Sequence, residues 1–204
     1  AYDEQTLPTV VGDRLAERDV TVVALPQAPD EDVEGVRETL ETAGATVADT
    51  VEVSETWASP ADDATTTRSD VGDTALDQLA VESAVPDGAQ QIDQALAVVL
   101  TGRSAEQDGD DVPQAQREQA WTSLHDEGLV DGPEEVPAAA DLVVVLGGPV
   151  AAETTDETDA VDRAAEREAN IWVALTHLIE THADGTVLAS ADAETGTGDA
   201  SPLT

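Results

Sequence analysis

Residues 18–47, RDVTVVALPQAPDEDVEGVRETLETAGATV, contain the strongest structural signal in the chain. Asp19–Leu25 is a continuous run rich in β-branched residues, which is typical of a strand buried on both faces. Pro29–Asp32 opens a helix with an acidic first turn, and apolar residues then recur at helical spacing as far as Gly44. A second strand follows at Thr46–Val53. The stretch therefore predicts a βαβ unit with a right-handed crossover.

The sequence beyond this unit continues to alternate helices and strands. Ser54–Gly72 is polar and is expected to be irregular, whereas Thr74–Glu82 predicts a short helix. Ile92–Leu100 carries the clearest amphipathic stripe in the chain, and Gly102 ends it. Another helix is expected between Pro113 and Gly128.

The last part of the chain supplies two more strands and a long helix. Strands are predicted at Ala140–Leu146 and Thr186–Ser190, with a helix between them that carries Trp172. We therefore predict an α/β fold, a three-layer, Rossmann-like and mostly parallel sheet with helices on both faces. Residues 1–18 are expected to end an N-terminal helix or coiled-coil linker, 19–190 to form a single α/β domain, and 191–204 to be a mobile polar tail.

The composition is that of an acidic protein. The formal net charge is −37 over 204 residues, and all eight basic residues are Arg. Such a polyanion is repelled by phosphate backbones and anionic lipids, so nucleic acid and direct lipid binding are not expected. The excess of acidic residues indicates a solvated surface adapted to salt, which is the simpler interpretation. The alternative is that these residues form a docking surface or bind cations.

The sequence offers little for metal binding. It has no Cys and no Met, which excludes disulfides and thiolate sites. His125, His177 and His182 are poorly spaced for a metal, and positions near helix C-termini favour a partly protonated His that interacts with the helix dipole. Asp108–Asp111, DGDD, lacks the register of a calcium loop. We predict no metal site and no cofactor.

Two other features have a structural and a functional interpretation. Gly147-Gly148-Pro149 follows a buried strand, where ligands sit in parallel sheets, but it lacks a phosphate-binding pattern and favours a tight turn. Trp57 either anchors its polar loop in the core or is a hot spot for a partner. Trp121 and Trp172 are expected in the core. No nucleophile–base arrangement is present in the sequence pattern, so no catalytic residue is assigned.

Several segments together resemble the MctB/SteB family of bacterial envelope proteins, described as copper transporters. Residues 18–47 are similar to the opening of its soluble domain. The same holds, in the same order, for VEVSETWASP, PDGAQQIDQALAVVLTG, QREQAWTSLHDEGLV and AADLVVVLGGP at 51–60, 86–102, 116–130 and 139–149. The similarity covers about 130 to 150 residues and carries no catalytic signature.

The resemblance implies a membrane-anchored protein whose α/β domain faces the outside of the cell. An N-terminal membrane helix and a coiled coil would precede this chain, which suggests a homodimer. Members are linked to copper homeostasis, to a proposed outer-membrane pore, and, for SteB, to the membrane partner SteA and control of septal cell-wall hydrolysis.

Three hypotheses follow for function. The first, which we favour, is a non-enzymatic, dimeric interaction module of the cell envelope. The alternative is a component of a copper efflux channel, although copper(I) prefers thiolate and thioether ligands that this sequence lacks. A nucleotide- or sugar-binding enzyme rests on fold analogy alone.

Overall fold

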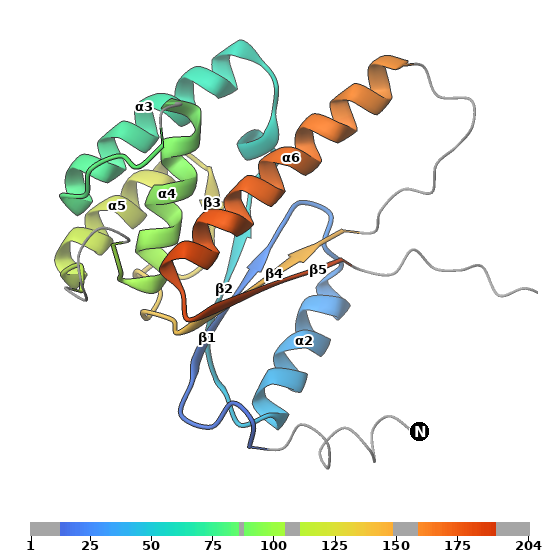
Figure 1. Cartoon of the computed structure of the whole chain (residues 1–204), viewed down its shortest axis with the longest axis vertical. Helices are drawn as coiled ribbons and strands as arrows, with labels where there is room; N and C mark the ends of the chain where they lie inside the picture. Colours follow the sequence, from blue (N-terminus) through green and yellow to red (C-terminus); the bar gives the residue numbers. More distant parts are fainter. Residues whose placement is uncertain (1–12, 86–87, 105–110, 149–158, 191–204) are drawn as a thin grey trace, which may run out of the picture.

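A computed structural model describes residues 13–85, 88–104, 111–148 and 159–190 (Figure 1). The elements, in chain order, are β1 (Asp19–Ala24), α2 (Asp30–Thr42), β2 (Thr46–Val53), the 3-10 helix η1 (Glu55–Ala58), α3 (Asp62–Leu79), α4 (Gly88–Thr101), α5 (Gln114–Asp126), β3 (Val130–Asp131), β4 (Leu142–Gly147), α6 (Asp159–His182) and β5 (Gly185–Ser190).

The strands form one sheet with the order β3-β2-β1-β4-β5. β1 pairs in parallel with β2 and β4, and β4 pairs in parallel with β5. The four predicted strands are thus confirmed within two residues at each boundary, and the two most apolar ones, β1 and β4, are interior neighbours. The sequence pattern did not indicate β3, which adds two residues to β2 in the antiparallel direction.

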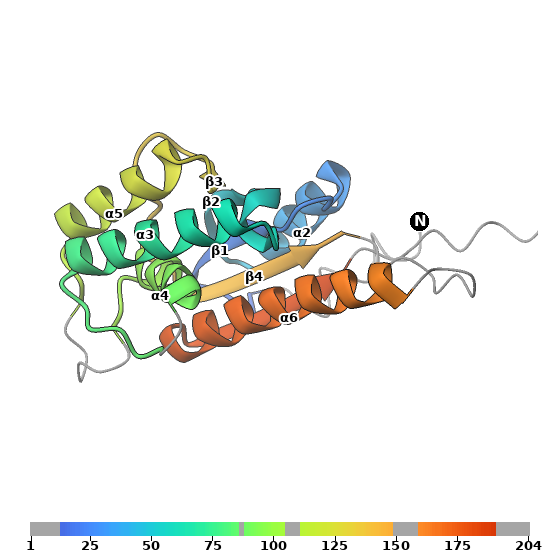
Figure 2. The same ribbon diagram turned by 90° about the horizontal axis from the view of Figure 1, so that it is seen from above.

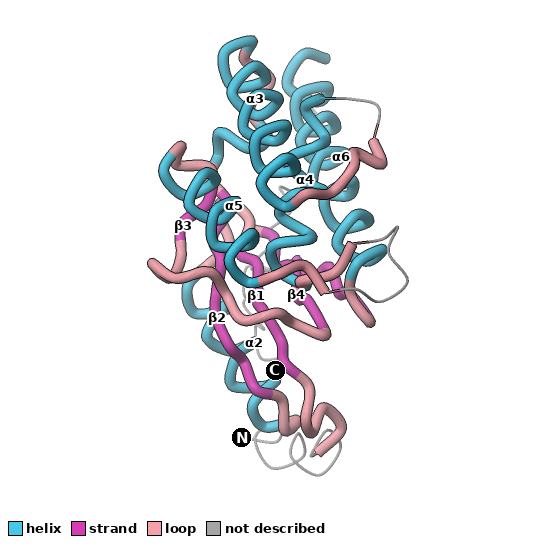
Figure 3. The backbone as a smooth tube through the Cα atoms, turned by 90° about the vertical axis from the view of Figure 1, so that its left-hand side faces the viewer, coloured by secondary structure: helices cyan, strands magenta, loops and turns pink. Residues whose placement is uncertain are grey.

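Helices cover both faces of the sheet, which confirms the predicted three-layer class. α2 lies on one face, whereas α6 and α4 lie on the other together with α3 and α5 (Figures 1 and 2). The tube in Figure 3 shows the same separation from the side. The crossover through α2 joins β1 to β2 on one face, whereas the crossover through α6 joins β4 to β5 on the other. The order of the strands along the sheet therefore reverses between β1 and β4. In open parallel sheets, this switch point is where a ligand crevice forms.

The prediction for Ser54–Gly72 was wrong. Instead of an irregular loop, the segment holds η1 and most of α3. The helix expected at Thr74–Glu82 is confirmed as far as Leu79, as the last part of this longer helix. The buried face of α3 begins with Ala64, Arg68 and Val71, which give a weak apolar signal in a sequence. Packing against α4 stabilises α3 as a helix despite the polar composition of the segment.

α4 is the centre of the core rather than an amphipathic surface helix. Every residue of Ile92–Thr101 is buried, because α3, α5 and α6 contact the helix and its apolar side chains share one core cluster with those of the strands. The fit between α3 and α4 is close: a Cβ placed on Gly72 would lie 2.7 Å from the Ile92 nitrogen. The predicted stripe identified the helix but not how completely it is enclosed.

The N-terminal boundary differs from the expectation of a helix. Residues 13–17 form a turn, and the Leu15 nitrogen donates to the Ala43 oxygen at 2.8 Å, which ties this turn to the end of α2. The rest of the predicted linker, residues 1–12, and the predicted tail, 191–204, lie outside the described residues.

Candidate functional site: a groove at the carboxyl edge of the sheet

Trp57, the residue singled out for partner binding, lies in the core. It has 0% exposure and belongs to η1, and its Nε1 donates to Asp93 Oδ1 on α4 at 2.7 Å. A ring enclosed in this way presents no surface to a partner, so the structure corrects the hot-spot assignment. The other interpretation, an anchor for the segment after β2, agrees with the observed position.

The Trp57–Asp93 pair forms a buried polar cluster with Arg68 of α3. The Arg68 guanidinium donates to the Trp57 oxygen and, at 3.1 Å, to the Ser59 oxygen, so it fastens η1 to α3. Burial raises the pKa of Asp93 from 3.8 to about 7, and the Trp57 hydrogen bond and the Arg68 charge only partly oppose that rise. Core residues enclose the cluster, so its role is to stabilise the packing of η1, α3 and α4.

The histidines are not brought together. His125 lies on α5, with its Nε2 4.0 Å from Asp131 Oδ1, whereas His177 is exposed on α6 and contacts Glu180. His182 is only 4% exposed, and burial lowers its pKa despite a contact between its Nδ1 and the Leu178 oxygen. For His182 the structure therefore acts against the expected protonated form, because desolvation outweighs the hydrogen bond to the Leu178 oxygen. The described residues contain no group of three His, Asp or Glu able to hold a metal ion.

The glycines at the end of β4, Gly147 and Gly148, form one wall of a groove. Gly148 approaches the loop after β1 so closely that a Cβ would lie 2.7 Å from the Gln27 oxygen. Gln27 itself has a left-handed φ of 67°, which is uncommon for a residue with a side chain. Two loops at the switch point are thus pressed together and locally constrained. Gly147 and Gly148 border a cavity. The tight turn that the sequence favours at 147–149 stays a prediction, because Pro149 lies outside the described residues.

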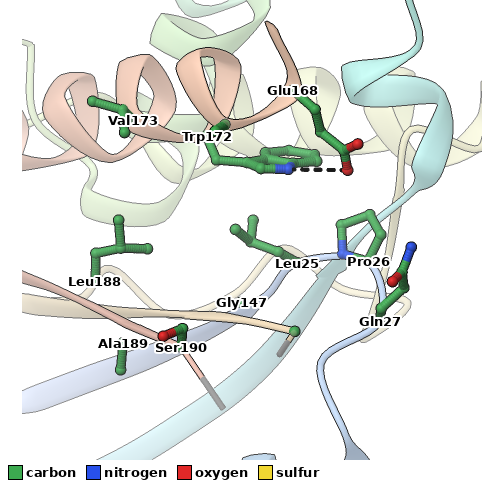
Figure 4. A pocket seen from close by; sticks show the side chains of 12 residues that line it. Leu25, Pro26, Gln27, Gly147, Glu168, Trp172, Val173, Leu188, Ala189 and Ser190 are labelled. Atoms are coloured by element: carbon green, nitrogen blue, oxygen red, sulfur yellow. Dashed lines mark hydrogen bonds between the residues drawn. The ribbon is translucent and has the colours of Figure 1, made fainter. Parts of the chain in front are cut away.

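The groove extends from these loops between α6 and β5 (Figure 4). It has a volume of about 520 Å³, within the usual range for binding pockets. The lining residues come from the carboxyl ends of three parallel strands and from one turn region of α6: Leu25, Pro26, Gln27, Gly147, Gly148, Glu168, Ala169, Trp172, Val173, Leu188, Ala189 and Ser190.

Trp172 dominates the helical wall. Its ring is half-buried, and its Nε1 donates to Glu168 Oε1, one turn earlier, at 3.4 Å (Figure 4). Leu188 points from β5 toward α6 and Val173. Trp172 was expected in the core; instead only part of it packs there, while the rest lines the groove.

The groove is apolar in a molecule whose surface is acidic. Large hydrophobic residues that are exposed within the described part of the chain number three: Val173 at 56%, Val187 at 58% and Leu188 at 47%. Two of them line the groove, and Val187 lies on the other face of the same strand. The polar side chains that line the groove are the Gln27 amide, the Glu168 carboxylate and the Ser190 hydroxyl. Such a surface suits an apolar side chain with a hydrogen-bonding or basic neighbour.

The opposite, amino end of the strands is occupied by ion pairs. Arg18 pairs with Asp184 at 2.8 Å, and Arg103 contacts both Asp184 and Asp141. The hydrogen bond from Arg103 is the main cause of a lowered Asp184 pKa. Asp141 also accepts from the Asp19 nitrogen, so the cluster joins the segments before β1, β4 and β5. The charges of this cluster are paired with one another, so the cluster holds the three segments together and leaves no charge for a ligand.

Sequence reasoning missed the groove because its residues are distant in the chain and individually ordinary. One signal was available: the first predicted strand ends at Leu25 and the third ends at Leu146, just before Gly147, and ligands bind where such ends flank a switch point. That rule locates the edge of the sheet. It does not identify Trp172 or Leu188, whose positions depend on how α6 packs.

These features define a doubly wound α/β domain with an apolar groove at its carboxyl edge. A family model described as "Copper transport outer membrane protein, MctB" matches residues 1–202. The chain therefore belongs to this family of copper-transport-related envelope proteins, which confirms the resemblance to MctB.

Two further findings accompany the family match. A search of curated proteins finds none that matches the chain. Across the described residues, the helices are too short or too polar to cross a membrane.

Proposed function

We propose that this domain is a non-catalytic, dimeric interaction module that faces the outside of the cell and docks an envelope protein. The observation that carries the proposal is the groove: an apolar surface with Trp172 at its wall, on a chain with a net charge of −37. Contiguous apolar surface on a soluble domain marks interaction sites, and half-buried aromatic residues are frequent anchors of binding energy.

The chemistry of the groove suggests the kind of partner. An apolar side chain would enter between Trp172 and Leu188, and a basic or amide neighbour would face Glu168. The acidic surface would accelerate the encounter with a basic partner and suppress acidic ones. By family resemblance, we infer a SteA-like membrane protein or a regulator of cell-wall hydrolysis as the partner, and a role at the division septum.

A component of a copper efflux channel is the second candidate, favoured by the description of the family. The sequence contains no Cys or Met, the ligands that copper(I) prefers. Under this alternative, the domain would contribute by holding other proteins together, so the groove would have the same role in both cases.

The test is recovery of a SteA-like protein from envelope extract by the immobilised chain. The wild type should capture it, Trp172→Ala should lose it, and Trp172→Phe, which keeps an aromatic anchor, should retain part of it. Equal recovery by wild type and Trp172→Ala would remove the groove from the proposal. Hydrolase or transferase activity that persists through purification to homogeneity would contradict a non-catalytic role.

A further inference from the structure

The outer edge of β5 differs from the rest of the molecular surface. β5 pairs with β4 from Gly185 to Ser190, and no described strand pairs with its other side. An edge strand presents free backbone donors and acceptors, and natural proteins usually protect such edges with charges, Pro or short strands. The opposite edge follows that practice, since β3 has two residues, one of them Asp131. β5 has six residues, GTVLAS, and none is charged.

Exposed apolar residues flank this edge on both faces of the sheet. Leu188 is paired with Val145, a core residue, and so points to the α6 face beside Val173. Val187 points to the α2 face, but the contacts of α2 are with β1 and β2, and Val187 is 58% exposed. The three exposed large hydrophobic residues of the described chain thus gather around one uncharged strand.

We propose that this edge is a homodimer interface, in which β5 pairs antiparallel with β5 of a second copy and joins the two sheets. The inference deepens the proposed function, which includes a dimer but does not locate its contact. A two-fold axis through Leu188 would place this residue opposite its counterpart, Val187 opposite Ala189, and Thr186 opposite Ser190. Directly opposed residues share a face of the sheet, so each pair is apolar with apolar or hydroxyl with hydroxyl.

A second copy fits this edge better than a basic partner does. A basic segment would gain most from carboxylates, and the strand carries none. Two copies that each carry a charge of −37 repel one another, so they can approach closely only where like charges are not opposed. The uncharged edge meets that condition.

The proposed dimer would also arrange the grooves. A two-fold axis perpendicular to the sheet keeps the faces in common, so both α6 helices and both grooves would open on the same side. Two docking sites on one face allow bivalent binding to a membrane-bound partner, which raises avidity without any new contact.

The experiment is sedimentation of the full chain at about 0.1 M and about 1 M NaCl. Wild type should dimerise more tightly at high salt, because screening weakens repulsion. Val187→Glu and Val187→Lys, at a position 58% exposed, should each weaken dimerisation at least roughly tenfold without loss of fold. An equimolar mixture of the two should restore it, since long side chains at diagonal positions across the axis can reach each other. Thr46→Glu, at an exposed position in β2, is the matched control.

Several outcomes would overturn the interface. Wild type that remains monomeric at about 0.1 mM protein and high salt would do so, as would Val187 variants that dimerise like wild type. So would dimers that weaken with salt, or a monomer that binds a polyarginine probe and loses it in Val187→Lys. Docking fails separately: a dimer that captures no envelope protein overturns the docking role alone, whereas a monomer that captures one through Trp172 overturns the dimer and its interface but keeps the docking role.

Discussion

Two tryptophans in this chain donate their indole nitrogens to carboxylates, in opposite surroundings. Trp57 is fully buried and contacts Asp93 at 2.7 Å, whereas Trp172 is half-buried at the rim of a groove and contacts Glu168 at 3.4 Å. The first pair joins η1 to α4, while the second lies within one helix. The same chemical pair therefore stabilises packing in one place and lines an open groove in the other, and burial distinguishes the two.

The largest expected effect comes from removing each indole. Trp57→Ala should lower the free energy of unfolding by about 3–5 kcal/mol, because it leaves a cavity and removes the hydrogen bond to a buried carboxyl. Trp172→Ala should cost about 1–2 kcal/mol, since much of its ring already contacts solvent. Urea unfolding measures both. Equal losses would show that the groove wall is as important for stability as the core.

The sequence left Trp57 open between a core anchor and a partner hot spot and placed Trp172 in the core, and the difference from the structure has a physical reason. Trp57 follows a strand in a polar segment, and nothing local reveals that Arg68, eleven residues later, bonds back to its carbonyl. Trp172 belongs to an apolar helical stripe, and its exposure depends on β5 ending the sheet beside it. Local patterns predicted β1, β2 and β4 because hydrophobic periodicity specifies them. They could not predict which side chain a neighbouring element leaves uncovered.

The second effect concerns the carboxylates. The pKa of Asp93 in the folded state is about 7, above its ordinary 3.8. The folded state is therefore more stable when Asp93 is protonated than when it is ionised. That contribution is complete below the unfolded pKa and is lost as pH rises from about 4 to about 7. Asp93→Asn should therefore be more stable than wild type above pH 7, with an upper limit of about 4 kcal/mol. Unfolding midpoints from pH 4 to 8 should change less in the variant.

The matched variant for that measurement is Glu168→Gln at the groove. Its carboxylate is exposed, so the substitution should change stability by less than about 0.5 kcal/mol. A pH profile for Asp93→Asn parallel to that of wild type would show that another buried group controls the acid side of the stability curve.

Salt should stabilise the whole domain without distinguishing the two tryptophan regions. Self-repulsion among the excess negative charges weakens as the Debye length falls from about 10 Å at 0.1 M to about 3 Å at 1 M. A gain of about 1 kcal/mol would raise Tm by roughly 2–4 °C in a domain of this size. The rise should be the same in wild type and Trp172→Ala, because the groove is uncharged apart from Glu168. A constant or falling Tm would exclude self-repulsion as the limiting factor.

Copper should have the smallest effect, and the two tryptophans provide the means to measure it. The sequence has no Cys and no Met, and the described residues contain no cluster of three possible oxygen or nitrogen side-chain ligands from His, Asp and Glu. Bound Cu(II) quenches nearby indole fluorescence, so of the three tryptophans a site in the groove would dim Trp172 and one in the core would dim Trp57 or Trp121. We expect no saturable quenching by nanomolar Cu(II) in either wild type or Trp172→Phe. We also expect neither protein to take nanomolar Cu(I) from a chelator. Stoichiometric quenching that Trp172→Phe abolishes would place a copper site in the groove and favour the efflux alternative. Weak quenching, linear in copper and suppressed by salt, would instead indicate diffuse attraction to the acidic surface, a result that leaves the docking proposal in place.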